Sequence, residues 1–379
     1  MSGPQGTDAR ARTRIALIGP VLPFRGGIAQ HTTLLYRALS ARADVTALSF
    51  SRQYPRWLFP GESDRDPSHE GRLEPGVAYT IDSLNPLTWR DAVRRIRGAA
   101  PHGLVLPWWS VYWTFCFHHI ATAARDAGIP VVFLCHNVVD HENAAWKRGL
   151  ANWVLGTTDR FVVHHEEGRR QLLKAFPGAT VRVHPHPTHV VFPEARDTLP
   201  RRAALELLFF GFVRPYKGLD VLIDAMALLR DQDIRLTVAG EFWSDVEPWR
   251  ARIASLGLQE RVELLPRYHS DEEVAELFAR ADAVVLPYRS ATGSAVIPLA
   301  YRYGKPVIAS NVGGLVDVVH PGETGLLVEA ASAAELANAI TSMSAPRAAA
   351  MRPAIEALAA SLTWEGLASS VLEALGVER

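Results

Sequence analysis

The chain has 379 residues, of which 48% are hydrophobic and 21% charged, and its 40 Lys and Arg residues balance 40 Asp and Glu residues. This length predicts two domains, and the balance excludes a chain drawn to nucleic acid or to an anionic membrane by its overall charge. Two cysteines, Cys116 and Cys135, exclude a disulfide framework and favour a reducing compartment. No stretch reaches the roughly 18 consecutive apolar residues of a membrane-spanning helix.

Short apolar segments alternate with amphipathic segments from residue 14 onward. Residues 14–20 have the pattern of a strand and residues 26–42 that of a helix, and the alternation continues to a strand near residue 180. A polar, proline-containing stretch follows, and the alternation starts again near residue 204. We therefore predict an α/β protein with two Rossmann-like, doubly wound domains that face a cleft, with ligands at the carboxyl ends of the strands.

Two cations follow the first strand of the second half, in "FFGFVRPYKGLDVL". The apolar run ends at Gly211, and Arg214 and Lys217 lie on the loop before a helix that starts near Leu219. Free N–H groups and the dipole at a helix amino terminus favour anions. Arg can hold phosphate oxygens in a fork and Lys adds a point charge, so the pattern indicates a diphosphate site. The alternative for an isolated R-x-x-K pattern is a pair of solvated loop residues.

The first half has a glycine loop at the corresponding place. In "GPVLPFRGGIAQHT", Gly26 and Gly27 lie where the first strand meets the first helix, and glycine lets the backbone approach a phosphate closely. The spacing differs from G-x-G-x-x-G, so it gives no support for a nicotinamide or flavin cofactor. A plain turn is the alternative.

Both halves resemble a known family. In the second half, "FFGFVRPYKGLDVLIDA", "LTVAGE", "ADAVVLPY" and "YRYGKPVIASNVGGLVDVVHPGETGLLVE" follow the order and spacing of the donor-binding domain of GT-B glycosyltransferases of family 4. In the first half, "GGIAQHTTLLYRAL", "VVFLCHN" and "HHEEGRRQLL" are similar to bacterial, group 1 members. The resemblance covers nearly the whole chain from Arg14. It implies transfer of a sugar from a nucleotide diphosphate, usually without a metal, with Arg214 and Lys217 holding the pyrophosphate.

The resemblance also gives a division of the chain. The expected parts are a disordered leader (1–13), an N-terminal Rossmann-like acceptor domain (14–190), a linker (191–203), a C-terminal Rossmann-like nucleotide-sugar donor domain (204–362) and a C-terminal helix that crosses back to the N-terminal domain (363–379).

The chain departs from the family pattern ahead of Gly304. The family typically carries two glutamates there, with seven residues between them, and this chain has Ala291 and Leu299. We expect neighbouring hydroxyls and backbone N–H groups to contact the donor instead, and Asp317 to lie near its ribose. The predicted donor-binding residues, which lie in glycine loops, at strand ends or ahead of Gly304, are Gly26, Gly27, Arg214, Lys217, Gly240, Glu241, Thr292, Gly293, Ser294 and Ala295.

The reacting end of the site is expected at "LCHN", where His136 ends a strand. The resemblance implies that His136 lies beside the donor sugar, so the predicted catalytic residues are His136, Arg214 and Lys217. A hydrogen-bonded structural histidine is the equal alternative for His136. The predicted acceptor-binding residues are His31, Trp108, Trp109, Asn137, Asp140, His141 and Glu142, although most aromatic residues of this region could instead belong to the core.

We therefore predict a cytoplasmic glycosyltransferase, for which the resemblance implies retention at the anomeric carbon and transfer without a metal. We expect no cofactor, no metal site, a UDP- or GDP-sugar as the donor, and a carbohydrate, lipid-linked or small-molecule acceptor with a free hydroxyl. Nucleic acid is not an expected partner, whereas peripheral contact with the inner face of the membrane and the oligomeric state stay open. Because both glutamates are missing, the alternatives are a noncatalytic nucleotide-sugar-binding or scaffold protein and a sugar-nucleotide epimerase of the same fold.

Overall fold

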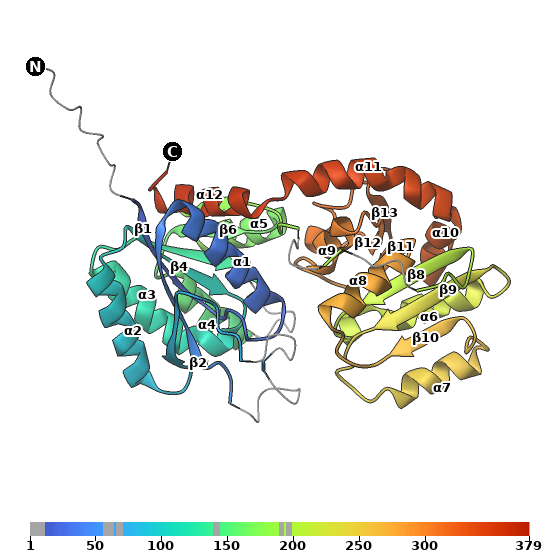
Figure 1. The fold of residues 1–379 in the computed structure, drawn as a ribbon, viewed down its shortest axis with the longest axis horizontal. Helices are drawn as coiled ribbons and strands as arrows, with labels where there is room; N and C mark the ends of the chain where they lie inside the picture. The colour runs from blue at the N-terminus through green and yellow to red at the C-terminus, as the bar shows by residue number, and fades with distance from the viewer. Residues whose placement is uncertain are drawn as a thin grey trace, which may run out of the picture.

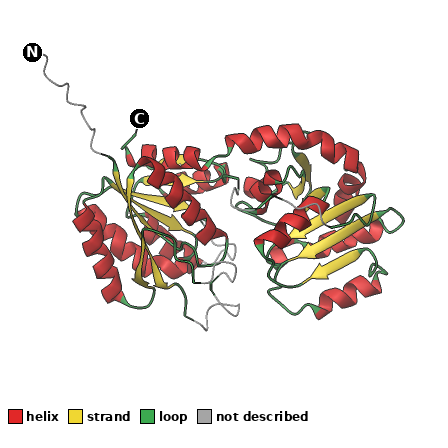
Figure 2. Cartoon of the chain, in the orientation of Figure 1, coloured by secondary structure: helices red, strands yellow, loops and turns green. Residues whose placement is uncertain are grey.

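The fold is described from a computed structural model, for residues 12–55, 64–65, 71–138, 145–188, 193–194 and 199–378. Two lobes lie side by side, each built on a parallel sheet with helices packed against it (Figures 1 and 2). The predicted α/β fold with two doubly wound sheets is confirmed. Residues 1–11 of the predicted leader and residues 191–192 and 195–198 of the predicted linker lie outside the described residues.

The first lobe has a seven-stranded parallel sheet with the order β3-β2-β1-β4-β5-β6-β7. Its central strands are buried on both faces, as their continuous apolar sequences predict. The edge strand β3 is half-buried and was not predicted. The strands are β1 (Arg14–Ile18), β2 (Asp44–Arg52), β3 (Val77–Asp82), β4 (Gly103–Trp108), β5 (Val131–Cys135), β6 (Arg160–Val163) and β7 (Thr180–Val183), and the helices are α1 (Gly27–Arg42), α2 (Pro86–Ala99), α3 (Thr114–Asp126), α4 (Ala145–Leu155) and α5 (Glu166–Ala175).

The second lobe has a six-stranded parallel sheet with the order β10-β9-β8-β11-β12-β13. It encloses its own hydrophobic core, which runs from Leu205 to Ile355. The strands are β8 (Leu205–Phe210), β9 (Ile234–Ala239), β10 (Val262–Leu265), β11 (Ala283–Leu286), β12 (Val307–Ser310) and β13 (Gly325–Val328), and the helices are α6 (Leu219–Leu228), α7 (Glu247–Ser255), α8 (Asp271–Arg280), α9 (Val296–Arg302), α10 (Ala333–Ser342) and α11 (Ala345–Ser361).

The helix α12 (Trp364–Leu375) lies on the first lobe, although the preceding α11 belongs to the second (Figure 1). It packs against α1 and against the face of the sheet that includes Leu17, Val105 and Leu134. Trp364 anchors it, because the indole N–H donates to the carbonyl oxygen of Thr188 over 2.8 Å. The end of the chain thus ties the two lobes together. None of the described helices is long and apolar enough to cross a bilayer.

Candidate functional site

The loop after β8 carries the two cations that the sequence assigns to a diphosphate. The chain forms one 3-10 turn at Pro215–Lys217 and enters α6 at Leu219. Gly218 joins the turn to the helix with a φ of +67°, and a Cβ there would lie 2.0 Å from the carbonyl oxygen of Pro287. Glycine is required by both constraints, and it fixes the lysine at the amino end of α6.

Lys217 is a buried cation. It is 8% exposed, and its Nζ lies 5.5 Å from the centre of the Tyr288 ring. In the part of the chain that the structure describes, no carboxylate approaches its Nζ within 4.0 Å. Burial lowers the pKa of Lys217, and the charge of Arg214 lowers it further. A buried, unpaired ammonium group is costly, so this position is prepared for an anion from outside the chain.

Arg214 lies at the start of the same turn and stacks on an aromatic residue. Its guanidinium carbon is 3.9 Å from the centre of the Trp243 ring, which is half exposed. Stacking orients the planar guanidinium group while its N–H groups stay available for phosphate oxygens. Trp243 was not predicted, because nothing in its local sequence separates it from other aromatic residues at strand ends.

The predicted donor residues Gly240 and Glu241 follow β9. The packing explains why residue 240 is a glycine, since a Cβ there would lie 2.3 Å from the carbonyl oxygen of Gly211. Glu241 forms an ion pair with Arg25, which precedes Gly26 in the first lobe. In this arrangement the carboxylate joins the two lobes, and Arg25 is a contact that the sequence analysis missed.

We expect the Arg25–Glu241 pair to stabilise the contact between the lobes. Its side chains are only 10% and 28% exposed, so a double-mutant cycle with alanine should give a coupling free energy of about 1–3 kcal/mol in chemical denaturation. The exposed pair Arg352–Glu356, at 66% and 57%, is the control and should give about 0.3–0.5 kcal/mol. Equal coupling in both pairs would contradict a role in joining the lobes.

The segment ahead of α9 uses its polar groups for contacts within the protein. Thr292 Oγ1 donates to Asn137 Oδ1 over 2.7 Å, which links the lobes, and Ser294 Oγ accepts the N–H of Val296 over 3.3 Å. Gly293 faces the His165 ring, which would lie 3.5 Å from an added Cβ, and Ala295 is the residue before α9. Where this segment meets the first lobe, a cavity of about 20 Å³ has room for one water-sized group.

Asp317 contacts the first lobe, although the sequence suggested a place near the donor ribose. Its Oδ2 accepts the backbone N–H of Glu166 over 2.8 Å. Beside it, His165 Nδ1 accepts the N–H of Gly168 over 2.9 Å. The amino end of α5 is therefore capped from both lobes, which satisfies N–H groups that a helix leaves unpaired.

The structure corrects one acceptor prediction and leaves others open. Trp108 is 2% exposed and packs edge-on against Phe133 in the first core, so it is no platform for a sugar. The reason is that β4 is central and covered on both faces. Trp109 is half-buried, and its indole N–H donates to Tyr54 Oη over 2.9 Å. The predicted residues Asp140, His141 and Glu142 lie outside the described residues.

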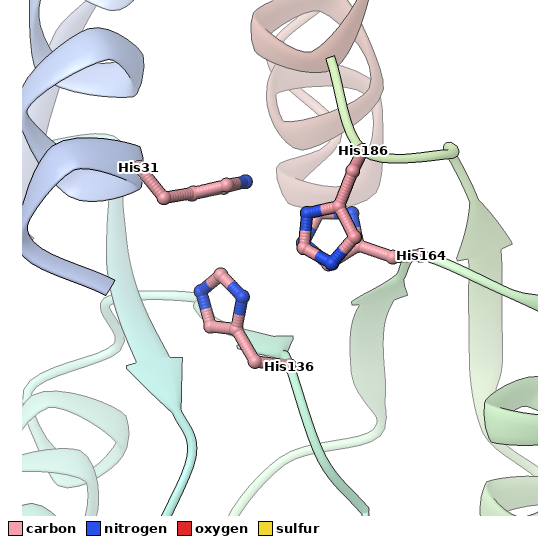
Figure 3. Close-up of side chains that lie close together, drawn as sticks. All are labelled: His31, His136, His164 and His186. Atoms are coloured by element: carbon pink, nitrogen blue, oxygen red, sulfur yellow. The ribbon is translucent and has the colours of Figure 1, made fainter. Parts of the chain in front are cut away.

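The predicted residues His31 and His136 belong to a cluster of four histidines (Figure 3). His136 follows β5, His164 follows β6, His186 follows β7, and His31 is on α1. Each residue offers a ring nitrogen, and these four nitrogens lie within 4.8 Å of one another. The sequence analysis missed His186, although the alternation in "VHPHP" puts His184 and His186 on one side of an extended chain.

A hollow of about 600 Å³ lies at the other end of the strands of the second sheet, away from the Lys217 loop. Arg302, Lys305 and Arg352 are among its lining residues. Lys305 precedes β12, so this hollow lies at the amino ends of the strands. Ligands of open α/β sheets bind outside the carboxyl ends of the strands, so the Lys217 loop is a better candidate for a ligand site than this hollow.

Comparison with known proteins shows which family the second lobe resembles. Residues 204–345, which include the whole Lys217 loop, match the family model described as glycosyl transferases group 1. The second lobe is thus similar to the group 1 glycosyltransferases. D-inositol 3-phosphate glycosyltransferases of Nocardia farcinica and Rhodococcus opacus are 31% and 33% identical over 65% and 66% of the chain. The alignments span 60% and 63% of these two relatives' own lengths.

Solved structures show that the chain has the GT-B fold along nearly its whole length. HepE of Anabaena in complex with UDP covers 96% of the chain and 99% of its own, with a TM-score of 0.73 and 19% identity. WaaG, a glycosyltransferase involved in lipopolysaccharide biosynthesis, covers 95% and 99%, with a TM-score of 0.64 and 15% identity. The prediction of the GT-B fold is thereby confirmed.

Proposed function

We propose that this protein transfers a sugar from a nucleoside-diphosphate donor to an acceptor hydroxyl. The observation that carries the proposal is the buried Lys217 at the amino end of α6, which has no ion-pair partner among the described residues. A diphosphate supplies the missing negative charge, and the helix amino terminus and the stacked Arg214 add to the attraction. A diphosphate has two anionic groups, one for each of the two cations, whereas a single carboxylate has only one.

The same residues support the chemistry of transfer. The bond between the anomeric carbon and the diphosphate oxygen breaks, and negative charge grows on that oxygen. Arg214 and Lys217 stabilise this charge where it develops, so they lower the barrier rather than only improving binding. The acceptor oxygen forms the new bond to the anomeric carbon. In the retaining reaction that we propose, its proton passes to the departing phosphate oxygen.

The comparisons suggest which substrates to test first. Solved structures of HepE hold UDP, UDP with glucose, and UDP-glucose, and the curated relatives are named for D-inositol 3-phosphate. We therefore propose a UDP-sugar as the donor, with UDP-glucose as the first probe and GDP-sugars as the comparison. The proposed acceptor is a hydroxyl of a glycan, a glycolipid or a small molecule, with D-inositol 3-phosphate as the first one tested.

Replacing Arg214 with alanine is expected to lower kcat/KM by about 100- to 1000-fold, because one preplaced donor to the developing charge is lost. The measurement is multiple-turnover release of UDP from UDP-glucose in the presence of an acceptor. Arg230→Ala, at an exposed arginine just after α6, is the matched control and should keep full turnover. Unchanged turnover in Arg214→Ala would refute the diphosphate role, whereas circular dichroism and thermal melting test whether the variant is folded.

A second candidate function is noncatalytic binding of a nucleotide sugar. It is favoured by the buried Ala291 and Leu299, which stand where the family typically has glutamates. Leu299 is part of the core of the second lobe, so this position offers no polar group to a donor. Stoichiometric binding of UDP-glucose without turnover, over a panel of acceptors, would favour this function over transfer.

A further inference from the structure

Four imidazole side chains converge beside α1, outside the Lys217 loop (Figure 3). Three of them follow the adjacent parallel strands β5, β6 and β7, and the fourth comes from α1. The ring centres of His31 and His136 are 4.5 Å apart, those of His31 and His164 4.9 Å, and those of His164 and His186 3.7 Å. Parallel strands bring their carboxyl ends to one edge, which is why residues distant in sequence meet here.

The hydrogen bonds fix which nitrogen of His164 is available. Its Nδ1 lies 2.9 Å from the carbonyl oxygen of His184, so Nδ1 carries the proton and donates. The lone pair is then on Nε2, which is buried and has no hydrogen-bond partner among the described residues. His136 Nε2 is in the same condition. A backbone carbonyl that orients one ring nitrogen while the other points to a shared centre is the usual arrangement of a metal-binding histidine.

The charge state of the cluster suits a cation. Burial lowers the pKa of His136 to about 3 and, together with the neighbouring imidazoles, lowers the pKa of His164 well below its usual range. Both rings are therefore neutral near pH 7. Neutral imidazole is a preferred ligand of zinc, copper and nickel, whereas the oxygen-seeking magnesium and calcium ions bind it poorly.

We propose that His31, His136, His164 and His186 bind one divalent transition-metal ion, for which zinc is the first probe. Tetrahedral zinc bound by nitrogen at about 2.0–2.1 Å needs nitrogens about 3.3 Å apart. The two nitrogens that are farthest apart lie within 4.8 Å of each other. Small changes of side-chain torsion angles that bring them closer by about 1.5 Å would complete the site. The four proposed ligands come from four different elements, so they lack the short sequence spacings that are typical of zinc sites.

The proposed ion has a structural role that is independent of the proposed transfer reaction. It ties α1 to the ends of three strands, and His31 also contacts Trp364 of α12 with ring centres 4.8 Å apart. The ion therefore joins the helix, the sheet and the segment that links the lobes. His136 is then a ligand that positions this framework rather than a group that touches the donor sugar.

The test is metal binding by the full-length protein after chelation and dialysis. Zn²⁺ is returned in equilibrium dialysis and counted by mass spectrometry, and Co²⁺ is titrated while visible absorption reports its coordination. We expect one ion per chain, an intense tetrahedral Co²⁺ band and a higher melting temperature with Zn²⁺. His164→Ala and His186→Ala should each weaken binding by more than tenfold, whereas His320→Ala, at an exposed histidine, should bind as the original chain does.

Two results would overturn the proposal. One is less than about a tenth of an ion bound per folded chain at micromolar free Zn²⁺, a concentration at which structural zinc sites are filled. The other is equal binding by the original chain and by both cluster variants, which would place the ion elsewhere. If His164→Ala does not fold, His186→Ala decides, because His186 is half-buried on a loop.

Discussion

Replacing Lys217 with methionine is expected to lower the affinity for UDP by at least about 100-fold. The reason is that the buried ammonium group has no carboxylate partner among the described residues, so the proposed diphosphate is the group that neutralises it. The same change should raise the free energy of unfolding of the ligand-free protein by about 1 kcal/mol or more, since an apolar side chain replaces a buried cation. Isothermal titration with UDP and chemical denaturation measure the two effects. Their opposite directions separate a binding residue from a structural one.

The affinity for UDP should also fall as the pH rises. Burial lowers the pKa of free Lys217 from 10.5, so the affinity for UDP is full below that lowered pKa and falls as the pH rises through it. Lys217→Arg should remove this fall, because arginine stays charged. Lys174→Met, at an exposed lysine, is the control and should change neither affinity nor stability. A Lys217→Met variant that binds UDP normally would contradict the donor site.

Replacing Trp364 with alanine is expected to lower the free energy of unfolding by about 3–5 kcal/mol. The indole is buried between α1 and the segment that links the lobes, and its N–H is bonded to Thr188. The loss combines a cavity with an unsatisfied carbonyl group. Chemical denaturation measures it.

Two further variants show where the loss comes from. Trp364→Phe keeps a ring and removes the N–H, so it should cost roughly 1 kcal/mol for the hydrogen bond and somewhat more for the smaller ring. Trp146→Ala, at a tryptophan that is 63% exposed, should change stability by no more than about 0.5 kcal/mol. A loss below about 1 kcal/mol in Trp364→Ala would show that α12 contributes little to the first lobe.

Much of the fold could be predicted because its elements are strongly patterned. Buried parallel strands such as β5 are continuous apolar runs, and the helices between them are amphipathic. The half-buried edge strand β3 lacks such a run, and it was missed for that reason. Trp108 was predicted to bind a sugar because it is aromatic and ends a strand. Its burial depends on the two strands that flank β4, and the local sequence does not determine the order in which strands pair.

The site was predictable in part for a similar reason. Arg214 and Lys217 lie within four residues of each other, so one loop reveals both. That Lys217 is buried depends on Tyr288, from a different strand end, and could not be predicted locally. Contacts between the lobes, such as Arg25 with Glu241, join residues more than 200 positions apart. Ion pairs across such distances follow from the packing of whole domains.

The position of α12 has a consequence for how the protein is made. The strands that form this apolar face of the first sheet are complete once β6 ends at Val163, and α1 packs against the face, but the second covering helix, α12, begins only at Trp364. A ribosome adding 5–20 residues per second needs about 10–40 s for the intervening stretch of about 200 residues. The second lobe closes its core with Ile355, before that cover emerges. The half that is translated first is thus the last to be finished, and during this interval the part of its sheet that α12 later covers is the surface that a nascent-chain chaperone would protect.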